Sequence, residues 1–148
     1  MKPYAENRKA HFDYVIVDTI EAGIELTGQE VKSIRNGKAR VDTAYALIRE
    51  GKAQALGIFI TPYQEKNTTP TYIPDHTRIL LLHKSEIEKI EKKCLSDKLT
   101  IIVLSLYSKG RKIKVLLGLA RGKKLYDKRQ TLKERAVDRD IKREYKVH

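Results

Sequence analysis

The sequence predicts a mainly β protein whose strands form a small, closed or nearly closed antiparallel barrel, with two or three short helices and a basic C-terminal tail. Six or seven short segments are rich in β-branched and aromatic residues, whereas only two short segments begin with a helix-capping pattern. The strands and helices do not alternate as a parallel doubly wound sheet requires. A barrel is the natural way to hide the edges of so many strands.

The N-terminal segment predicts a loose arm followed by a strand. Met1 to Arg8 is polar, and Phe12 to Ile20 is β-branched and aromatic. Glu21-Ala22-Gly23 then interrupts the pattern, and its glycine allows a bulge or a tight bend. We expect Ile24 to Leu26 to resume pairing.

A short helix follows. Thr27-Gly28-Gln29-Glu30 has the spacing of a capping box, in which Thr27 and Glu30 each satisfy a backbone N–H of the other. Val31 and Ile34 are spaced to face the core, and Asn36-Gly37 is a C-terminal stop signal.

The middle of the chain predicts a hairpin and a short strand. Val41 to Arg49 and Ala53 to Ile60 are strand-like, and Glu50-Gly51 is the turn between them. Thr61 to Pro74 contains three prolines and predicts a loop. Ile79 to Leu82 predicts a short buried strand.

The last part of the folded region predicts one helix and two strands. Ser85-Glu86-Ile87-Glu88 is a second candidate capping box, opening a helix that runs to about Lys93. Thr100 to Tyr107 and Ile113 to Ala120 have the clearest strand patterns, and Lys109-Gly110 marks the turn between them.

Residues 121–148 form a strongly basic tail behind a folded domain that spans residues 1–120. The tail holds 11 Lys and Arg against 5 Asp and Glu, half of the chain's net charge of +12. So dense a charge cannot build a core, and a polyanion such as RNA would supply the missing counter-charge. We expect the tail to be disordered when free and helical on RNA. The alternatives are a solvated tail without a partner and an amphipathic helix packed permanently on the barrel.

No catalytic constellation is found in the sequence, so an enzyme is the weaker class. None of the four histidines has the spacing of a metal site, and Cys94 is the only cysteine, which excludes an internal disulfide. We expect no cofactor and no metal. The N-terminus lacks a signal-peptide core, and no apolar run is long enough to span a membrane, so we expect a soluble, cytoplasmic monomer without a membrane partner.

Binding signals are stronger than catalytic ones. The chain has eight tyrosines, whose rings can stack on bases. Separate basic groups lie on the predicted folded part, at Asn7-Arg8-Lys9, at Lys32, Arg35, Lys38 and Arg40, and at Lys109, Arg111 and Lys112. With the tail, they suggest an extended track for phosphates, although the sequence does not show that they share a side.

The order of several motifs resembles one family, the SsrA-binding protein (small protein B), the partner of transfer-messenger RNA in bacterial ribosome rescue. The two most specific segments run from Glu21 to Ala39 and from Gly122 to Arg129. Shorter matches support them at Asn7-Arg8-Lys9-Ala10, Asp13-Tyr14, Leu80-Leu81-Leu82-His83-Lys84 and Ser105-Leu106-Tyr107.

The resemblance implies an oligonucleotide-binding-type barrel that contacts the elbow of the tRNA-like part of transfer-messenger RNA. It also implies that the tail reaches the decoding centre and the vacant mRNA channel of a stalled ribosome. In the family, the positions matching Asn7, Glu21, Leu81 and His83 belong to the elbow-binding surface. The runner-up function is a structural component of the ribosome.

The resemblance and the basic groups together define two sets of candidate residues. The RNA-binding set comprises Asn7, Arg8, Glu21, Gly23, Lys32, Lys38, Arg78, Leu81, His83 and Lys84. The ribosome-binding set of the tail comprises Lys123, Lys124, Tyr126, Asp127, Lys128, Arg129, Lys133, Arg135, Arg139 and Arg143.

The chain departs from the family pattern at three places. His11-Phe12 replaces the usual Arg-His, and the segment from Ile73 to Ile79 keeps only one proline and one arginine of the usual motif. In the tail, Ala136-Val137 stands where a tryptophan is common.

Overall fold

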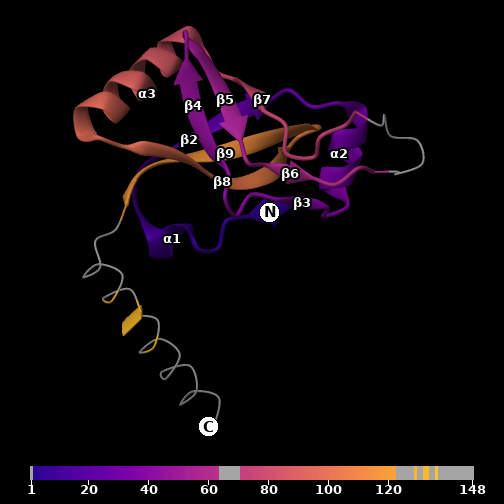
Figure 1. Cartoon of the computed structure of the whole chain (residues 1–148), viewed down its shortest axis with the longest axis horizontal. Helices are drawn as coiled ribbons and strands as arrows, with labels where there is room; N and C mark the ends of the chain where they lie inside the picture. Colours follow the sequence, from indigo (N-terminus) through magenta and orange to yellow (C-terminus); the bar gives the residue numbers. More distant parts are fainter. Residues whose placement is uncertain (1, 64–70, 123–128, 130–131, 134–135, 137–148) are drawn as a thin grey trace.

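The computed structural model describes residues 2–63, 71–122, 129, 132, 133 and 136 (Figure 1). The strands are β1 (Ala5–Glu6), β2 (Tyr14–Ile24), β3 (Ala39–Arg40), β4 (Tyr45–Arg49), β5 (Lys52–Leu56), β6 (Phe59–Ile60), β7 (Arg78–Leu81), β8 (Thr100–Lys109) and β9 (Lys112–Gly122). The helices are α1 (Ala10–Asp13), α2 (Gly28–Arg35) and α3 (Lys84–Asp97).

Six strands close into an antiparallel ring, which confirms the predicted barrel. The order around the ring is β8-β4-β5-β7-β2-β9, and β9 pairs with β8 to complete it. On the edge of β8 that pairs with β4, β1 pairs with the later residues of β8, Ser105 and Leu106. β3 pairs with β6 in a separate two-stranded sheet. Closure leaves few unpaired edges, which is the physical reason for a barrel with so many short strands.

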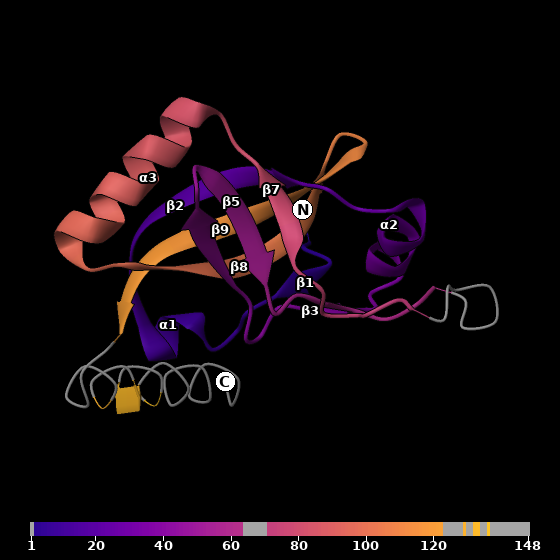
Figure 2. The ribbon, with the colours of Figure 1, turned by 45° about the horizontal axis from the view of Figure 1, so that its top comes forward.

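The core fills the inside of this ring. Alternate residues of the long strands point inward, and Val103, Leu106, Val115 and Leu117 are almost completely buried. α3 adds Ile87 and Ile90 to the same core. α2 and α3 lie at opposite sides of the barrel (Figure 2).

The capping pattern of α2 is confirmed. The backbone N–H of Glu30 donates to Thr27 Oγ1 at 3.2 Å, and the backbone N–H of Thr27 donates to Glu30 Oε1 at 3.0 Å. α3 begins earlier and ends later than predicted. Its N-cap is His83, whose backbone N–H donates to Glu86 Oε1 at 3.1 Å, so the box predicted at Ser85 lies two residues too late.

The N-terminal arm is not loose, and this prediction is wrong. β1 pairs with β8, and the backbone N–H groups of Tyr4 and Asn7 donate to the carbonyls of Leu106 and Leu104, each at 2.8 Å. α1 was not predicted. Its Ala10 is buried in a small second cluster on the outside of β8 and β9.

Two predicted strands differ in the structure. The strand predicted at Val41–Arg49 begins only at Tyr45, as β4, and β3 lies before it at Ala39–Arg40. The strand predicted at Ala53–Ile60 is divided into β5 and β6, because the chain turns at Gly57. Gly57 has a φ of +79°, and a Cβ there would lie 2.9 Å from the carbonyl oxygen of Thr43. Only glycine fits this close approach without strain.

The irregularity of β2 also lies elsewhere than predicted. Glu21, Ala22 and Gly23 pair regularly with β9, and the register shifts between Ile16 and Asp18 instead. By contrast, the turn at Glu50-Gly51 is confirmed. Both residues have positive φ, as the tight turns of two-residue hairpins require.

Candidate nucleic-acid interface

A cleft of about 860 Å³ lies over β2, β7 and the start of α3. Five of the predicted RNA-binding residues line it, namely Glu21, Gly23, Leu81, His83 and Lys84. These residues are up to 63 positions apart in the sequence, so the fold brings them together. Leu81 and His83 are well exposed there, with 52% of Leu81 and 90% of the His83 side chain accessible.

A row of paired residues crosses four neighbouring strands beside this cleft. Gly23 pairs with Leu81 of β7 on one side and with Lys114 of β9 on the other, and Lys114 pairs with Tyr107 of β8. Their sequence neighbours Ala22, Leu80, Val115 and Leu106 are buried in the core. Since side chains alternate along a strand, the row faces outward.

Gly23 allows Leu81 to lie across β2. A Cβ on Gly23 would be 3.0 Å from the Cβ of Leu81, which is closer than side chains normally approach. Leu81 therefore extends its apolar side chain over a strand that has no side chain at that point. The result is an exposed apolar platform next to Glu21, which is two residues before Gly23 on the same face.

The carboxylate of Glu21 is held by two side chains from β8. The hydroxyl of Tyr107 donates to Glu21 Oε2, and Lys109 Nζ lies 3.0 Å from Glu21 Oε1. The hydrogen bond from Tyr107, followed by that from Lys109, holds the pKa of Glu21 below its ordinary value of 4.5. Glu21 is therefore a fixed, ionised acceptor at neutral pH.

The cleft combines three kinds of chemistry. Its apolar part includes Ile79 and Leu81, its cations include Lys52, Lys84 and Lys114, and Glu21, Glu25 and Glu86 are acidic. A purely phosphate-binding groove would not carry three carboxylates. The mixture suits a folded RNA surface, where bases offer apolar faces and hydrogen-bond donors and the backbone offers phosphates.

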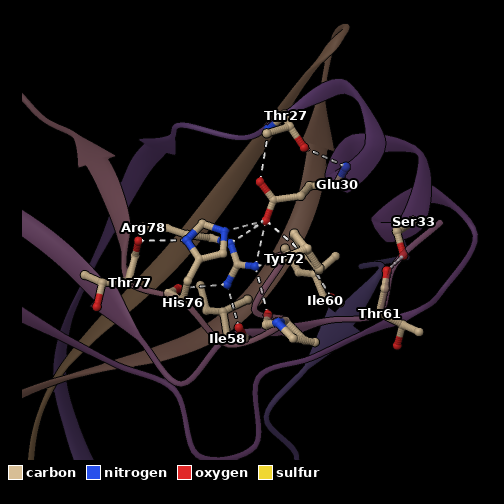
Figure 3. A network of polar contacts seen from close by, with 11 residues as sticks. Thr27, Glu30, Ser33, Ile58, Ile60, Thr61, Tyr72, His76, Thr77 and Arg78 are labelled. Carbon is tan, nitrogen blue, oxygen red and sulfur yellow. Dashed lines mark hydrogen bonds and ion pairs between the residues drawn. The ribbon is translucent and has the colours of Figure 1, made fainter. Parts of the chain in front are cut away.

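The prediction that Arg78 binds RNA is wrong, because Arg78 is not at the surface. Its side chain is fully buried and forms an ion pair with the buried Glu30, with Nη2 2.6 Å and Nε 2.8 Å from Oε2 (Figure 3). Its guanidinium also donates to the carbonyls of Ile58 at 2.6 Å and Pro74 at 2.9 Å. These bonds leave Arg78 unavailable to RNA, although it lies close to Leu81 and His83 in the sequence.

Two further side chains complete this buried cluster around Glu30. His76 Nε2 lies 3.1 Å and the Tyr72 hydroxyl 3.3 Å from Glu30 Oε2 (Figure 3). The Tyr72 hydroxyl is also 2.9 Å from the carbonyl oxygen of Ile60. The cluster ties α2, β6 and the segment before β7 into one unit.

The remaining predicted residues of the barrel lie outside the cleft. Asn7 and Arg8 connect β1 to α1, and Arg8 is exposed. Lys32 is on α2 with its Nζ 5.7 Å from the ring centre of Tyr63, and Lys38 is exposed just after that helix. The basic groups of the sequence are therefore distributed over several surfaces.

A second basic surface forms where α2 meets the β8–β9 turn. Arg35 Nη2 donates to the carbonyl oxygen of Arg111 at 2.8 Å. Two of the basic groups found in the sequence thus share a side, which the sequence alone did not show.

Most of the predicted tail residues lie outside the described residues. These are Lys123, Lys124, Tyr126, Asp127, Lys128, Arg135, Arg139 and Arg143. Arg129 and Lys133 are described, and both are helical and exposed.

Sequence reasoning missed the roles of Tyr107, Lys109 and Lys114. Tyr107 appeared only as part of a short family motif and Lys109 only as part of a basic group. The outward alternation of Tyr107 and Lys109 on one strand is visible in the sequence, but their common partner Glu21 is on a different strand.

The described part of the chain contains no group of three or more His, Cys, Asp or Glu residues placed to hold a metal ion. Among its helices, none is both long and apolar enough to cross a membrane.

Comparison with known proteins agrees with the resemblance seen in the sequence. The family model "SmpB protein" matches residues 4–147. The chain is 53% identical over 143 residues to the SsrA-binding protein of Staphylococcus epidermidis, covering 97% of this chain and 91% of that protein. It is 52% identical to the SsrA-binding protein of Chlorobaculum tepidum, covering 91% and 86% of the two chains.

A solved structure gives the same picture. It is described as "tmRNA-SmpB: a journey to the center of the bacterial ribosome", and one of its chains matches with a TM-score of 0.67 and 42% identity. The match covers 81% of this chain and 84% of that one.

Proposed function

Because the chain belongs to the SmpB protein family, we propose that it is an RNA-binding adaptor that binds transfer-messenger RNA and delivers it to stalled ribosomes for trans-translation. The observation that carries this proposal is the agreement of the whole chain, barrel and tail, with SsrA-binding proteins. The cleft beside Glu21 and Leu81 supports it physically, because it offers an apolar platform, a fixed acceptor and cations on one surface.

We assign the two parts of the chain different tasks. The barrel contacts the tRNA-like part of the RNA through the cleft residues Glu21, Gly23, Leu81, His83 and Lys84. The tail begins at the last two residues of β9 and is the basic segment that enters the decoding centre and the vacant mRNA channel. Tyr126 would stack there on a base, and Lys128 and Arg129 would neutralise phosphates.

The adaptor role requires no bond-breaking chemistry. Glu21 is held as an acceptor by Tyr107 and Lys109, and the buried pair of Glu30 and Arg78 fixes α2 to the barrel. We therefore propose that the protein has no enzymatic activity, binds no metal or cofactor and acts in the cytoplasm, where ribosomes stall.

The test compares two ligands for the purified full-length protein. We expect tight, saturable binding to the isolated tRNA-like part of transfer-messenger RNA and protection of its elbow in footprinting. Glu21→Ala should weaken this binding without unfolding the barrel, whereas Glu88→Ala, on the exposed side of α3 and outside the cleft, should not. Binding only to assembled ribosomal subunits would contradict the proposal and favour a structural ribosomal component.

A further inference from the structure

We propose that Tyr107 and Lys109 are positioning residues that hold the Glu21 carboxylate to accept hydrogen bonds from the Watson–Crick edge of an unpaired guanine. This inference rests on the proposed function, because it names the chemistry that the cleft reads in its RNA. It extends that function from general RNA binding to the recognition of one kind of base.

The first step is the geometry of the three side chains. Glu21 is on β2 and Tyr107 and Lys109 are on β8, and the intervening strand β9 pairs with both. Each carboxylate oxygen of Glu21 has one of these partners, Tyr107 on Oε2 and Lys109 on Oε1. Two contacts from one strand fix both the position and the rotation of the carboxylate.

The second step is the acceptor capacity that remains. A carboxylate has about four lone-pair positions, and the two partners from β8 occupy one on each oxygen. About a third of the Glu21 side chain is exposed, and it lines the cleft. The carboxylate therefore presents two adjacent acceptors to whatever lies in the cleft.

The third step is the protonation state of the pair. The same two partners keep the pKa of Glu21 low, so the group is ionised, and burial followed by the hydrogen bond to Glu21 raises the pKa of Tyr107 above its ordinary value of 10.0. Tyr107 therefore remains a donor and Glu21 remains an acceptor throughout the physiological range. Their roles do not exchange.

The fourth step is the identity of the ligand group. An ionised carboxylate repels phosphate, so Glu21 must contact hydrogen-bond donors of the RNA. Guanine is the base that carries two donors side by side, its N1–H and its N2 amino group, and both are free only when the base is unpaired. Two parallel donors match the two oxygens of a carboxylate, as in other bidentate pairs.

The neighbours of Glu21 fit this ligand. Leu81 offers an exposed apolar surface against which the face of the base can pack, and the absence of a side chain at Gly23 lets this surface extend over β2 toward Glu21. Lys114, paired with Gly23, also lines the cleft and can neutralise the phosphate of the same nucleotide.

The test combines single-atom changes in the protein and in the RNA. Tyr107→Phe removes only the hydroxyl group. The matched control is Tyr45→Phe, because Tyr45 is an exposed tyrosine of β4 that lies outside the cleft. The RNA is the tRNA-like part of transfer-messenger RNA, with each unpaired guanine replaced in turn by inosine, which lacks the N2 amino group. Binding is measured by titration, and thermal unfolding of each variant is measured alongside it.

We expect one inosine position to weaken binding to the wild-type protein about tenfold, the value of one charge-assisted hydrogen bond. Tyr107→Phe should reduce this discrimination to about twofold or less by the same reasoning, with unfolding unchanged. Lys109→Gln should act in the same direction, and Lys109→Arg should restore the discrimination. Tyr45→Phe should behave as the wild type.

Three results would overturn the inference. Equal discrimination by the wild type and Tyr107→Phe would mean that Tyr107 does not position Glu21. A loss of thermal stability with equally weaker binding of every RNA would assign Tyr107 a structural role only. If 2′-deoxy substitutions in the RNA weakened binding but no inosine replacement did, the ligand of Glu21 would be a ribose hydroxyl. Failure of the proposed function is distinguishable, because the wild type would then bind the tRNA-like RNA no better than an unrelated hairpin.

Discussion

Glu30 and Arg78 are 48 residues apart in the sequence, yet Arg78 Nη2 lies 2.6 Å from Glu30 Oε2 inside the protein. Glu30 has two further tasks, since the same residue forms the capping box of α2 and accepts from His76 and Tyr72. One carboxylate therefore both caps α2 and ties it to the segment before β7.

Removing one partner of this pair should strongly destabilise the protein. Arg78→Met leaves the Glu30 charge buried without its main partner, and changes of this kind cost about 3–5 kcal/mol. We expect this loss in the free energy of unfolding measured with urea. The double variant Glu30→Gln, Arg78→Met should recover part of it, because no uncompensated charge remains.

The matched control is the exposed pair of Lys93 and Asp18, whose charged atoms are 3.6 Å apart. Lys93→Gln should change stability by less than about 1 kcal/mol. If Arg78→Met were as mild as Lys93→Gln, the buried pair would not hold α2 in place.

The same carboxylate should make stability depend on pH in the acid range. Burial raises the pKa of Glu30, but the backbone N–H of Thr27 and the guanidinium of Arg78 outweigh it and leave the pKa below 4.5. The unfolded chain therefore takes up this proton first as pH falls. The stabilisation is complete well above pH 4.5 and is lost as pH falls through that value toward the folded-state pKa.

This pH effect is measured by urea unfolding of the wild type and of Glu30→Gln between pH 7 and pH 3. The difference in unfolding free energy between the two proteins should shrink toward acid pH. A constant difference over this range would show that Glu30 has the same pKa in both states.

Gly23→Ala should weaken RNA binding more than it weakens the fold. The added methyl group would meet the Cβ of Leu81, which cannot move without its backbone, so β7 and the apolar platform must shift. Gly118→Ala is the control, because its added methyl group would first meet Cδ1 of Leu104, at the flexible end of a side chain. Titration with the tRNA-like RNA, together with thermal unfolding, separates binding from stability. Equal binding by both variants would contradict the role of the platform.

Deleting the chain after Arg121 should separate RNA binding from ribosome rescue. The last buried core residue that the structure describes is Ala120, so the truncated protein keeps the core of the barrel, should remain folded and should bind isolated transfer-messenger RNA. Tagging on stalled ribosomes should be lost, and replacing Tyr126, Asp127 and Lys128 with alanine should reproduce that loss. Normal tagging by the truncated protein would refute the function assigned to the tail.

The affinity for RNA should depend on salt. If several Lys and Arg side chains neutralise phosphates, the logarithm of the affinity falls linearly with the logarithm of the salt concentration. The slope of this line is about −0.7 to −0.9 for each phosphate contact. Lys84→Gln and Lys114→Gln should each reduce the slope by about one such contact. A slope near zero in the wild type would contradict phosphate binding.

Features that depend on neighbouring residues were predictable from the sequence. The capping box of Thr27 and Glu30 and the turn at Glu50-Gly51 follow from spacing and residue type, and the long strands β8 and β9 follow from their apolar patterns. The barrel also followed, because antiparallel strands without alternating helices have few other ways to cover their edges.

Features that depend on distant residues were not predictable. Arg78 looked like a surface cation because its buried partner Glu30 is far away in the sequence, and β1 looked like a free arm because its partner is β8. Half of the candidate RNA-binding residues do meet in the cleft, but Tyr107 and Lys109 are 86 and 88 positions from Glu21. Composition and periodicity contain no information on such pairs.

The ring of strands also has a consequence for the synthesis of this protein. β1, β2 and β4 are made early, but each depends on β8 or β9 for a pairing partner, and these are the last strands to leave the ribosome. A chain cut short before Thr100 would retain open strand edges and an uncovered core, and such surfaces aggregate or are degraded. When its own message is broken before the codon for Thr100, a ribosome therefore yields no closed barrel of this rescue adaptor.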